Sequence, residues 1–168
     1  FAAGDTAALT GRALYGWRAL QASHCTACHT PPLFTNNEFF QIGLRRADFD
    51  RGRENDTGDA EDAGEMKVPS LRNVALRARF MHTGEFTSLG AAIHFYIITL
   101  ALPERDGIPG AGLYTFNMSN VDESDLREFI ATALTDPRVR DETFPFDGPV
   151  LRSERGASPA VIAGNAAP

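Results

Sequence analysis

The residues of this chain best suited to chemistry are two thiols and an imidazole that lie close together in the sequence. Cys25 and Cys28 are separated by two residues, and His29 directly follows the second cysteine. This spacing is the attachment pattern of c-type haem, in which the thiols form thioethers with the porphyrin vinyl groups and the imidazole takes one axial position on the iron. The sequence therefore predicts one covalently bound haem c.

Other uses of a CxxC pair fit this chain less well. The chain has 2 cysteines in all, so a structural zinc site would lack the second pair of ligands that it needs. A thioredoxin-like redox pair requires a βαβ setting, and no parallel-strand pattern surrounds the motif. A disulfide across two residues is geometrically awkward and leaves His29 unexplained. An unrelated CxxC pair is the remaining alternative.

Length and charge limit the class of protein. A chain of 168 residues is the size of one domain, and its net charge of -6 includes a single lysine, Lys67. The arginines are scattered singly or in pairs, which argues against a nucleic-acid-binding face. The longest apolar run, around residues 93–102, is shorter than the ~18–20 residues of a membrane span.

The start of the chain bears on its location. It begins on Phe1 rather than methionine, so we expect that a signal peptide or a larger N-terminal portion has been removed. Haem is attached to CxxCH motifs outside the cytoplasm. Both observations favour an extracytoplasmic location, most simply a bacterial periplasm.

Hydrophobic spacing predicts a mostly α-helical domain with three principal helices around the haem, long irregular loops and at most a minor β element. The first helix covers residues 10–25 and delivers the attachment motif; Gly11 and Gly16 would let another helix approach closely. Trp17 on this helix is either a core residue or an electron-hopping residue. Four residues follow helical spacing along one face of this amphipathic helix: Leu14, Trp17, Leu20 and Gln21.

The second predicted helix, residues 89–102, is capped by Thr87 or Ser88 and is apolar on two sides. One side carries Leu89, Ala92, Ile93, Tyr96, Ile97 and Leu100, and the other Phe95, Ile98 and Leu102. This pattern predicts either a fully buried helix or a face covered by another haem domain or subunit.

The third predicted helix begins with Asp122 as N-cap and crosses the first beside the haem, as in cytochrome c folds. Its inward residues are Leu126, Phe129, Ile130 and Leu134. We therefore expect a cytochrome c-like haem domain over residues 1–136. An extended Pro-containing tail, pinned by Phe144 and Phe146, follows over residues 137–168. Residues 45–65 read as a solvated surface loop, because their aspartates do not have the spacing of an EF-hand.

Two further motifs carry a resemblance to a known family. They are Pro69-Ser70-Leu71-Arg72-Asn73 and Phe80-Met81-His82-Thr83-Gly84, the latter followed by a helix that opens near Leu89. Together with the haem motif they resemble the C-terminal haem domain of the bacterial di-haem cytochrome c peroxidase and MauG-like family. The resemblance runs from about residue 11 to residue 134.

The sixth iron ligand is a point on which two lines of reasoning differ. Considered as soft ligands, Met66, Met81 and Met118 are the candidates, and Met81 is favoured because it lies in a compact turn beside aromatic residues. The family resemblance instead implies the residue 14 positions after His82, which is Tyr96. Peroxidases of the family have methionine there and MauG-like enzymes have tyrosine. Tyr96 also lies on the inward face of its predicted helix.

The resemblance implies roles for other residues too. Arg72 would meet a haem propionate, with a structural salt bridge as the alternative. His82 would make a polar contact near the haem or at a domain boundary. Family members bind a calcium ion between two haems through carbonyls of a Thr-Ala-Pro segment. This chain has Arg77-Ala78-Arg79 there, which weighs against calcium.

These features leave two main classes of function open. One is a c-type haem protein that carries electrons to or from a partner haem. The other is a fragment or subunit of a di-haem peroxidase or MauG-like oxidising enzyme, whose catalytic haem lies on another segment or chain. The reason is that the sequence holds one CxxCH motif where the family's enzymes use two. Reaction of peroxide at this haem, after Tyr96 dissociates, is a third and weaker alternative.

Overall fold

The computed structural model describes residues 4–9, 11–99 and 120–147, and in that part the chain is rich in helix and has few strands. It divides into two compact units, Phe1–Asp136 and Pro137–Pro168. The helices of the first unit are α1 (Arg12–Ala22), α2 (Glu54–Thr57), α3 (Leu89–Thr99) and α4 (Asn120–Thr132). Its strands are β1 (Phe39–Phe40) and β2 (Met66–Lys67), which pair antiparallel with Phe39 opposite Lys67.

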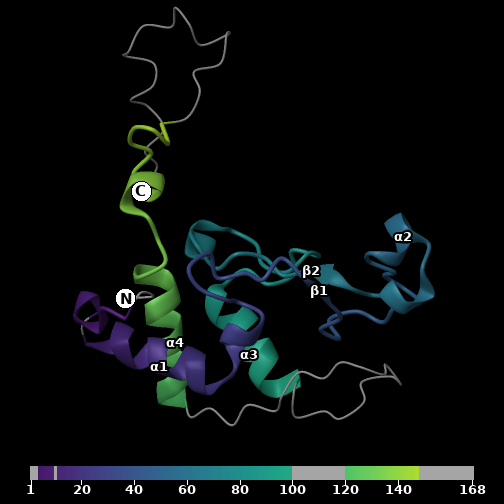
Figure 1. The fold of residues 1–168 in the computed structure, drawn as a ribbon, viewed down its shortest axis with the longest axis horizontal. Coiled ribbons are helices and arrows are strands. Elements are labelled where there is room, and N and C mark those ends of the chain that lie inside the picture. The colour runs from purple at the N-terminus through teal and green to yellow at the C-terminus, as the bar shows by residue number, and fades with distance from the viewer. Residues whose placement is uncertain (1–3, 10, 100–119, 148–168) are drawn as a thin grey trace, which may run out of the picture. The chain divides into compact units, whose positions relative to one another are not determined.

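The first unit is built on the contact between α1 and α4, which Figure 1 shows packed against each other. Gly16 makes this contact possible, because a Cβ atom added there would lie 2.0 Å from the carbonyl oxygen of Asp125. The close approach predicted for Gly16 is thus confirmed. The same prediction for Gly11 is wrong: an added Cβ would meet nothing within 4 Å, and Gly11 instead precedes α1 with φ 53°.

Apolar side chains from α1, α3, α4 and the loop after the haem motif form one core. Phe34, Phe129, Leu20 and Leu134 are its fully buried members. Trp17 belongs to this core, with its ring 5.6 Å from that of Phe129 and 6.1 Å from that of Phe34. The core interpretation of Trp17 is therefore supported by its packing. Gln21, which shares its predicted face, is exposed.

Helix α3 buries residues on both of its predicted apolar sides, namely Ala92 and Ile93 on one and Phe95 on the other. The Ser88 hydroxyl accepts a hydrogen bond from the Ala91 amide at 3.1 Å, which confirms Ser88 as a cap. Phe95, expected on a face for a partner, is 6% exposed and lies against Phe86 and Tyr96 within its own chain. Ile98 is 53% exposed. Leu100 and Leu102 lie outside the described residues, as does Met118.

Helix α4 begins at Asn120, two residues before the N-cap predicted at Asp122. Its inward residues are as expected: Leu126, Phe129, Ile130 and Leu134 are all buried. The side chain of Arg12, at the start of α1, donates from Nε to Asp125 on α4 at 2.7 Å. This ion pair fastens the two helices at the same place as Gly16.

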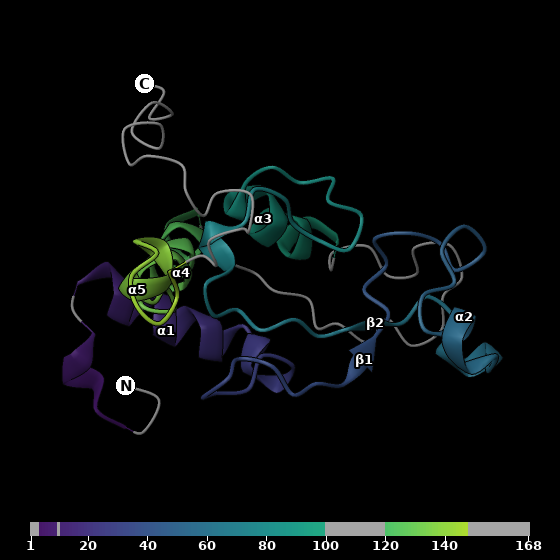
Figure 2. The ribbon, with the colours of Figure 1, turned by 90° about the horizontal axis from the view of Figure 1, so that it is seen from above.

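The segment that joins the haem motif to α3 contains the strands and α2. In two views α2 lies away from α1, with β1 and β2 between them (Figure 1 and Figure 2). Residues 45–65 form a surface segment, but one ordered by α2, a 3-10 turn at Ala60–Asp62 and several ion pairs. The sequence missed this order because α2 has four residues and no apolar periodicity.

The second unit opens with a short helix, α5 (Pro137–Arg140), where extended chain was expected. Arg138 lies 5.3 Å from the ring centre of Phe146, a cation–π contact. Phe144 is 83% exposed, so it does not pin the tail as predicted.

Candidate haem site

The attachment motif begins directly after α1. The amide of Ser23 bonds to the Ala19 carbonyl at 2.9 Å and ends the helix, and Cys25–Ala27 then form a 3-10 turn. The His29 amide closes this turn on the Cys25 carbonyl at 2.8 Å. Cys25 and Cys28 are free thiols at partly buried positions. The backbone thus holds both sulfurs and the imidazole on one compact turn.

The two thiols have the wrong acidity for redox or nucleophilic work. Burial raises the pKa of Cys25 to about 11, and burial also raises the pKa of Cys28. Reactive CxxC pairs need a lowered pKa, because the thiolate is the nucleophile. The pair therefore does not suit thiol–disulfide exchange.

His29 is oriented as an iron ligand should be. Its Nδ1 lies 3.1 Å from the carbonyl oxygen of Phe34, a contact that requires the proton on Nδ1 and leaves the lone pair of Nε2 for a metal. Burial lowers the pKa of His29, while the Phe34 and Pro69 carbonyls oppose that effect. The neutral imidazole, which is the form that binds metal, is therefore favoured.

The Pro69–Asn73 motif proves to be the support of the loop that carries this carbonyl. The Leu71 amide donates to the Phe34 carbonyl at 3.2 Å, and the Ser70 hydroxyl donates to the Leu33 carbonyl. Arg72 donates from Nε to the Pro32 carbonyl at 2.8 Å. This bond to a backbone carbonyl is neither the predicted contact with a haem propionate nor the alternative salt bridge. Sequence reasoning gave Arg72 an electrostatic role and missed its backbone contact.

Asn73 joins the same support to the end of α4. Its amide donates to the Leu134 carbonyl and its side-chain oxygen accepts from the Asp136 amide, both at 2.8 Å. The motif therefore lies between the loop after the haem motif and the last principal helix. Asn73 has φ 59° and precedes a short 3-10 turn. Asparagine tolerates this left-handed conformation, so the residue type is the part of this arrangement that the sequence shows.

Tyr96 and Met81, the two leading candidates for the sixth ligand, lie together. The Tyr96 hydroxyl is 4.0 Å from the Met81 sulfur, and a thioether is a weak acceptor. Burial raises the pKa of Tyr96 to about 12, and negative charge on Cys25 and Cys28 adds to the effect. The Tyr96 side chain as a whole is partly exposed. A partly buried phenol with so weak a partner fits a position beside a metal.

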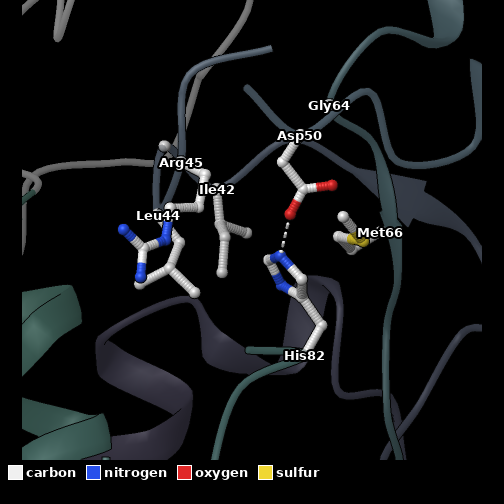
Figure 3. Close-up of a pocket in the computed structure, with 8 residues that line it drawn as sticks. Ile42, Leu44, Arg45, Asp50, Gly64, Met66 and His82 are labelled. Carbon is white, nitrogen blue, oxygen red and sulfur yellow. Dashed lines mark hydrogen bonds and ion pairs between the residues drawn. The ribbon is translucent and has the colours of Figure 1, made fainter. Parts of the chain in front are cut away.

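His82 follows Met81 in the same turn. Its Nε2 is 2.6 Å from a carboxylate oxygen of Asp50, and both side chains line a small pocket that Figure 3 shows in close-up. The rest of the lining consists of Ile42, Gly43, Leu44, Arg45, Gly64 and Met66. The structure therefore assigns His82 a carboxylate partner. The sequence gave no signal for Asp50, which lies 32 residues away.

Taken together, the donor set fits a c-type haem. It supplies two thiols for thioethers, one imidazole whose Nδ1 bonds to the Phe34 carbonyl and one phenol on α3. Within the described residues there is no cluster of three or more histidine, cysteine, aspartate or glutamate side chains for a metal ion. No helix of the described part is long and apolar enough to cross a membrane.

Sequence comparison finds haem enzymes among the relatives of this chain, although no family model matches it. Cytochrome c peroxidase Ccp of Escherichia coli is 33% identical over 114 residues, which are 61% of this chain and 24% of that protein. The methylamine utilization protein MauG of Methylophilus methylotrophus is 30% identical over 131 residues, 76% of this chain and 38% of that protein.

Comparison with solved structures finds a similar fold in proteins of the same kind as these relatives. A MauG-like protein associated with microbial copper homeostasis matches 84% of this chain and 48% of its own, with a TM-score of 0.64 and 24% identity. The diheme peroxidase BthA from Burkholderia thailandensis matches 83% of this chain and 46% of its own, with a TM-score of 0.61 and 24% identity. At that identity the likeness shows the fold alone.

The chain is a homologue of the cytochrome c peroxidases and MauG proteins, a family of haem oxidoreductases. It spans less than half the length of these relatives, between 24% and 38% of the two curated proteins. The matched stretch is consistent with one haem domain of the family.

Proposed function

We propose that this chain is a c-type haem domain that carries electrons to or from a partner haem, corresponding to the C-terminal haem domain of the family. One haem would be held covalently through Cys25 and Cys28, with His29 and Tyr96 as axial ligands. The observation that carries the proposal is the bond from Nδ1 of His29 to the Phe34 carbonyl. It leaves Nε2 of His29 free for iron at the residue that the CxxCH pattern requires.

Bound haem would supply a one-electron iron couple, and the protein's own residues would set its properties. The Phe34 carbonyl strengthens His29 as a donor by accepting a hydrogen bond from its Nδ1–H group. Tyr96 must lose its phenol proton to bind as a phenolate. Burial, which raises the pKa of Tyr96 to about 12, opposes that loss until a ferric ion offsets it. A phenolate ligand favours ferric iron and a low potential, whereas a thioether favours ferrous iron.

Covalent attachment is tested by extraction of the native protein with acidified acetone. If Cys25 and Cys28 form thioethers, the haem stays with the polypeptide, and Cys25→Ala or Cys28→Ala leaves at most one such bond. Loss of haem to the solvent from the native protein would refute the attachment.

The assignment of Tyr96 is tested by ferric absorption and electron paramagnetic resonance of the native protein, Tyr96→Phe and Met81→Leu. Tyr96→Phe should change both spectra, while Met81→Leu should keep the pattern of tyrosinate ligation. A methionine–iron charge-transfer band that survives Tyr96→Phe and disappears in Met81→Leu would reverse the assignment.

A second candidate function is that the chain is a piece or subunit of a di-haem peroxidase or MauG-like enzyme whose catalytic haem lies elsewhere. The coverage supports it: the matched part is 48% of the MauG-like structure and 46% of the diheme peroxidase. The mass of the native polypeptide and its haem-to-protein ratio separate the two candidates. A native particle with one haem and no other protein would favour an autonomous cytochrome.

A partner haem unit requires a docking surface, and α3 supplies part of one. Ile98 is a large hydrophobic residue exposed on that helix, while Phe95 is already covered by its own chain. We therefore assign the predicted contact to Ile98 rather than Phe95. An extracytoplasmic location, most simply the periplasm, accompanies the proposal because haem is attached to CxxCH motifs there.

A further inference from the structure

Two ion pairs join the turn that carries Met81 to the loop of residues 42–50. Arg45 of the loop donates to Glu85 of the turn at 2.6 Å, and His82 of the turn lies 2.6 Å from Asp50 of the loop (Figure 3). The polarity is crossed, since each segment supplies one basic and one acidic side chain. We call these four residues the clasp.

The turn needs outside support because its backbone is strained. Met81 has φ 62°, a left-handed conformation that costs a residue with a Cβ atom roughly 1–3 kcal/mol and persists only where its surroundings enforce it. The backbone bonds within the turn are few, namely Phe80 to Phe86 at 3.0 Å and Gly84 to Met81 at 3.1 Å. The clasp adds the Arg45–Glu85 ion pair and the contact between His82 and Asp50.

The turn places the Met81 sulfur 4.0 Å from the Tyr96 oxygen. A thioether has no proton to donate, so a sulfur at this position excludes water and other donors from that side of the oxygen. A hydrogen bond donated to an anionic ligand withdraws electron density from the metal and raises its reduction potential. The placement of Met81 therefore bears on the redox properties of a haem bound by Tyr96.

We propose that the clasp residues Arg45, Asp50, His82 and Glu85 are positioning residues, which hold Met81 against the Tyr96 oxygen and keep hydrogen-bond donors away from it. Met81 is thus a shield for the ligand and not a ligand itself. This inference rests on the proposed ligation of the haem by Tyr96.

The test compares two aspartates of one loop in the haem-loaded full chain. Asp50→Asn weakens the clasp, whereas Asp48→Asn makes the same charge change in the exposed Arg46–Asp48 pair, both of whose residues belong to the loop itself. We expect Asp50→Asn to raise the reduction potential further than Asp48→Asn does and to alter the ferric spectrum. Equal potentials and unchanged spectra in the two variants would overturn the proposal.

A second set of variants tests the shield without relying on the clasp to fold. Met81→Leu keeps a side chain with no donor and should leave the potential close to that of the native protein, whereas Met81→Ser introduces a donor and should raise it. Equal shifts in these two variants would also overturn the proposal. Arg45→Glu alone should shift the reduction potential and the ferric spectrum. The double variant Arg45→Glu with Glu85→Arg should return both towards those of the native protein.

These outcomes are separate from those of the proposed function. If Tyr96→Phe leaves the ferric spectrum unchanged, the ligation by Tyr96 is wrong, and the shield is wrong with it. If Tyr96→Phe changes the spectrum while the clasp and Met81 variants behave like Asp48→Asn, the ligation stands and only the shield is wrong.

Discussion

The crossing of α1 and α4 and the segment of residues 38–86 are held together by different forces. At the crossing, aromatic and aliphatic side chains are completely enclosed, as Phe34 and Phe129 illustrate with exposures of 0%. Across residues 38–86, the buried hydrophobic residues are Val68 and Phe80, and each is 7% exposed. That segment relies on ion pairs and short hydrogen-bonded turns.

The difference shows where a cofactor would matter most. Burial of apolar surface contributes about 25 cal/mol per Å², so the crossing has a source of stability in its own side chains. Exposed ion pairs contribute about 0–1 kcal/mol each, which leaves the segment of residues 38–86 weakly stabilised by itself. We expect loss of haem to loosen this segment before the crossing. Fluorescence of Trp17, the single tryptophan, reports on the crossing.

The largest effect is expected from breaking the crossing at its closest point. In Gly16→Ala the new Cβ would lie 2.0 Å from the Asp125 carbonyl oxygen and 2.6 Å from the Phe129 Cβ, so the helices must separate. Overpacking of this kind costs roughly 1–3 kcal/mol and occasionally more, and we expect about 3 kcal/mol here because backbone is the obstacle. Denaturant unfolding of the haem-loaded protein measures the loss.

Gly90 in α3 is the matched control for this substitution. Its nearest neighbour for an added Cβ is the end of the Arg127 side chain at 3.4 Å, which is able to move. Because alanine is the better helix former, Gly90→Ala should be neutral or stabilising by up to about 1 kcal/mol. Similar losses in the two variants would mean that helix contact at Gly16 is not what limits stability.

A smaller effect is expected from the ion pair at the same crossing. Arg12→Ala removes the guanidinium 2.7 Å from Asp125, whose side chain is 11% exposed. We expect a loss of about 1–2 kcal/mol, reduced by the exposure of Arg12 itself. Arg140→Ala breaks the exposed Arg140–Asp141 pair and should not change the unfolding midpoint measurably. If Arg12→Ala is as stable as Arg140→Ala, the ion pair does not stabilise the crossing, and apolar contacts alone do.

The crossing is also the region that sequence patterns predict best. Leu126, Phe129, Ile130 and Leu134 recur at helical spacing, and that spacing alone identifies their buried face. Gly16 was identifiable because a glycine on an apolar helical face has few other uses. The bounds of the helices were predicted less well, since they depend on caps: α1 starts at Arg12 and α4 at Asn120.

The haem ligands and the residues that support them also differ in how well the sequence predicts them. Cys25, Cys28 and His29 form a local pattern, so their roles follow from spacing. The partners of His82 and Arg72 are Asp50 and the Pro32 carbonyl, 32 and 40 residues distant. No short motif encodes such pairings, because they depend on how the loops fold back. Phe95 was misassigned for a related reason: the aromatic ring that covers it belongs to Phe86, in a turn before its own helix.

The smallest effect is expected at the centre of the charged segment, and it tests whether that segment unfolds as a local unit. Arg53 lies 3.2 Å from Glu65 and 3.4 Å from Asp62, and its guanidinium is 4.6 Å from the ring centre of Phe39. Its side chain is 38% exposed. Arg53→Ala should therefore cost about 1 kcal/mol, chiefly in the local stability of residues 52–65.

Hydrogen exchange makes this local cost visible, because amides such as that of Gly64, bonded to the Arg51 carbonyl at 2.8 Å, report on the segment directly. The neighbouring Arg51 is the comparison: its side chain is 62% exposed and pairs with Glu54 at 3.3 Å. The ring of Phe39 lies under Arg53 instead, so Arg51→Ala should speed exchange less than Arg53→Ala does. Arg53→Lys keeps the charge but loses the planar contact with Phe39, so it should fall between the two. If Arg53→Ala instead speeds exchange in α1 and α4 as much as in residues 52–65, the two regions unfold together, and the contrast between them does not extend to their dynamics.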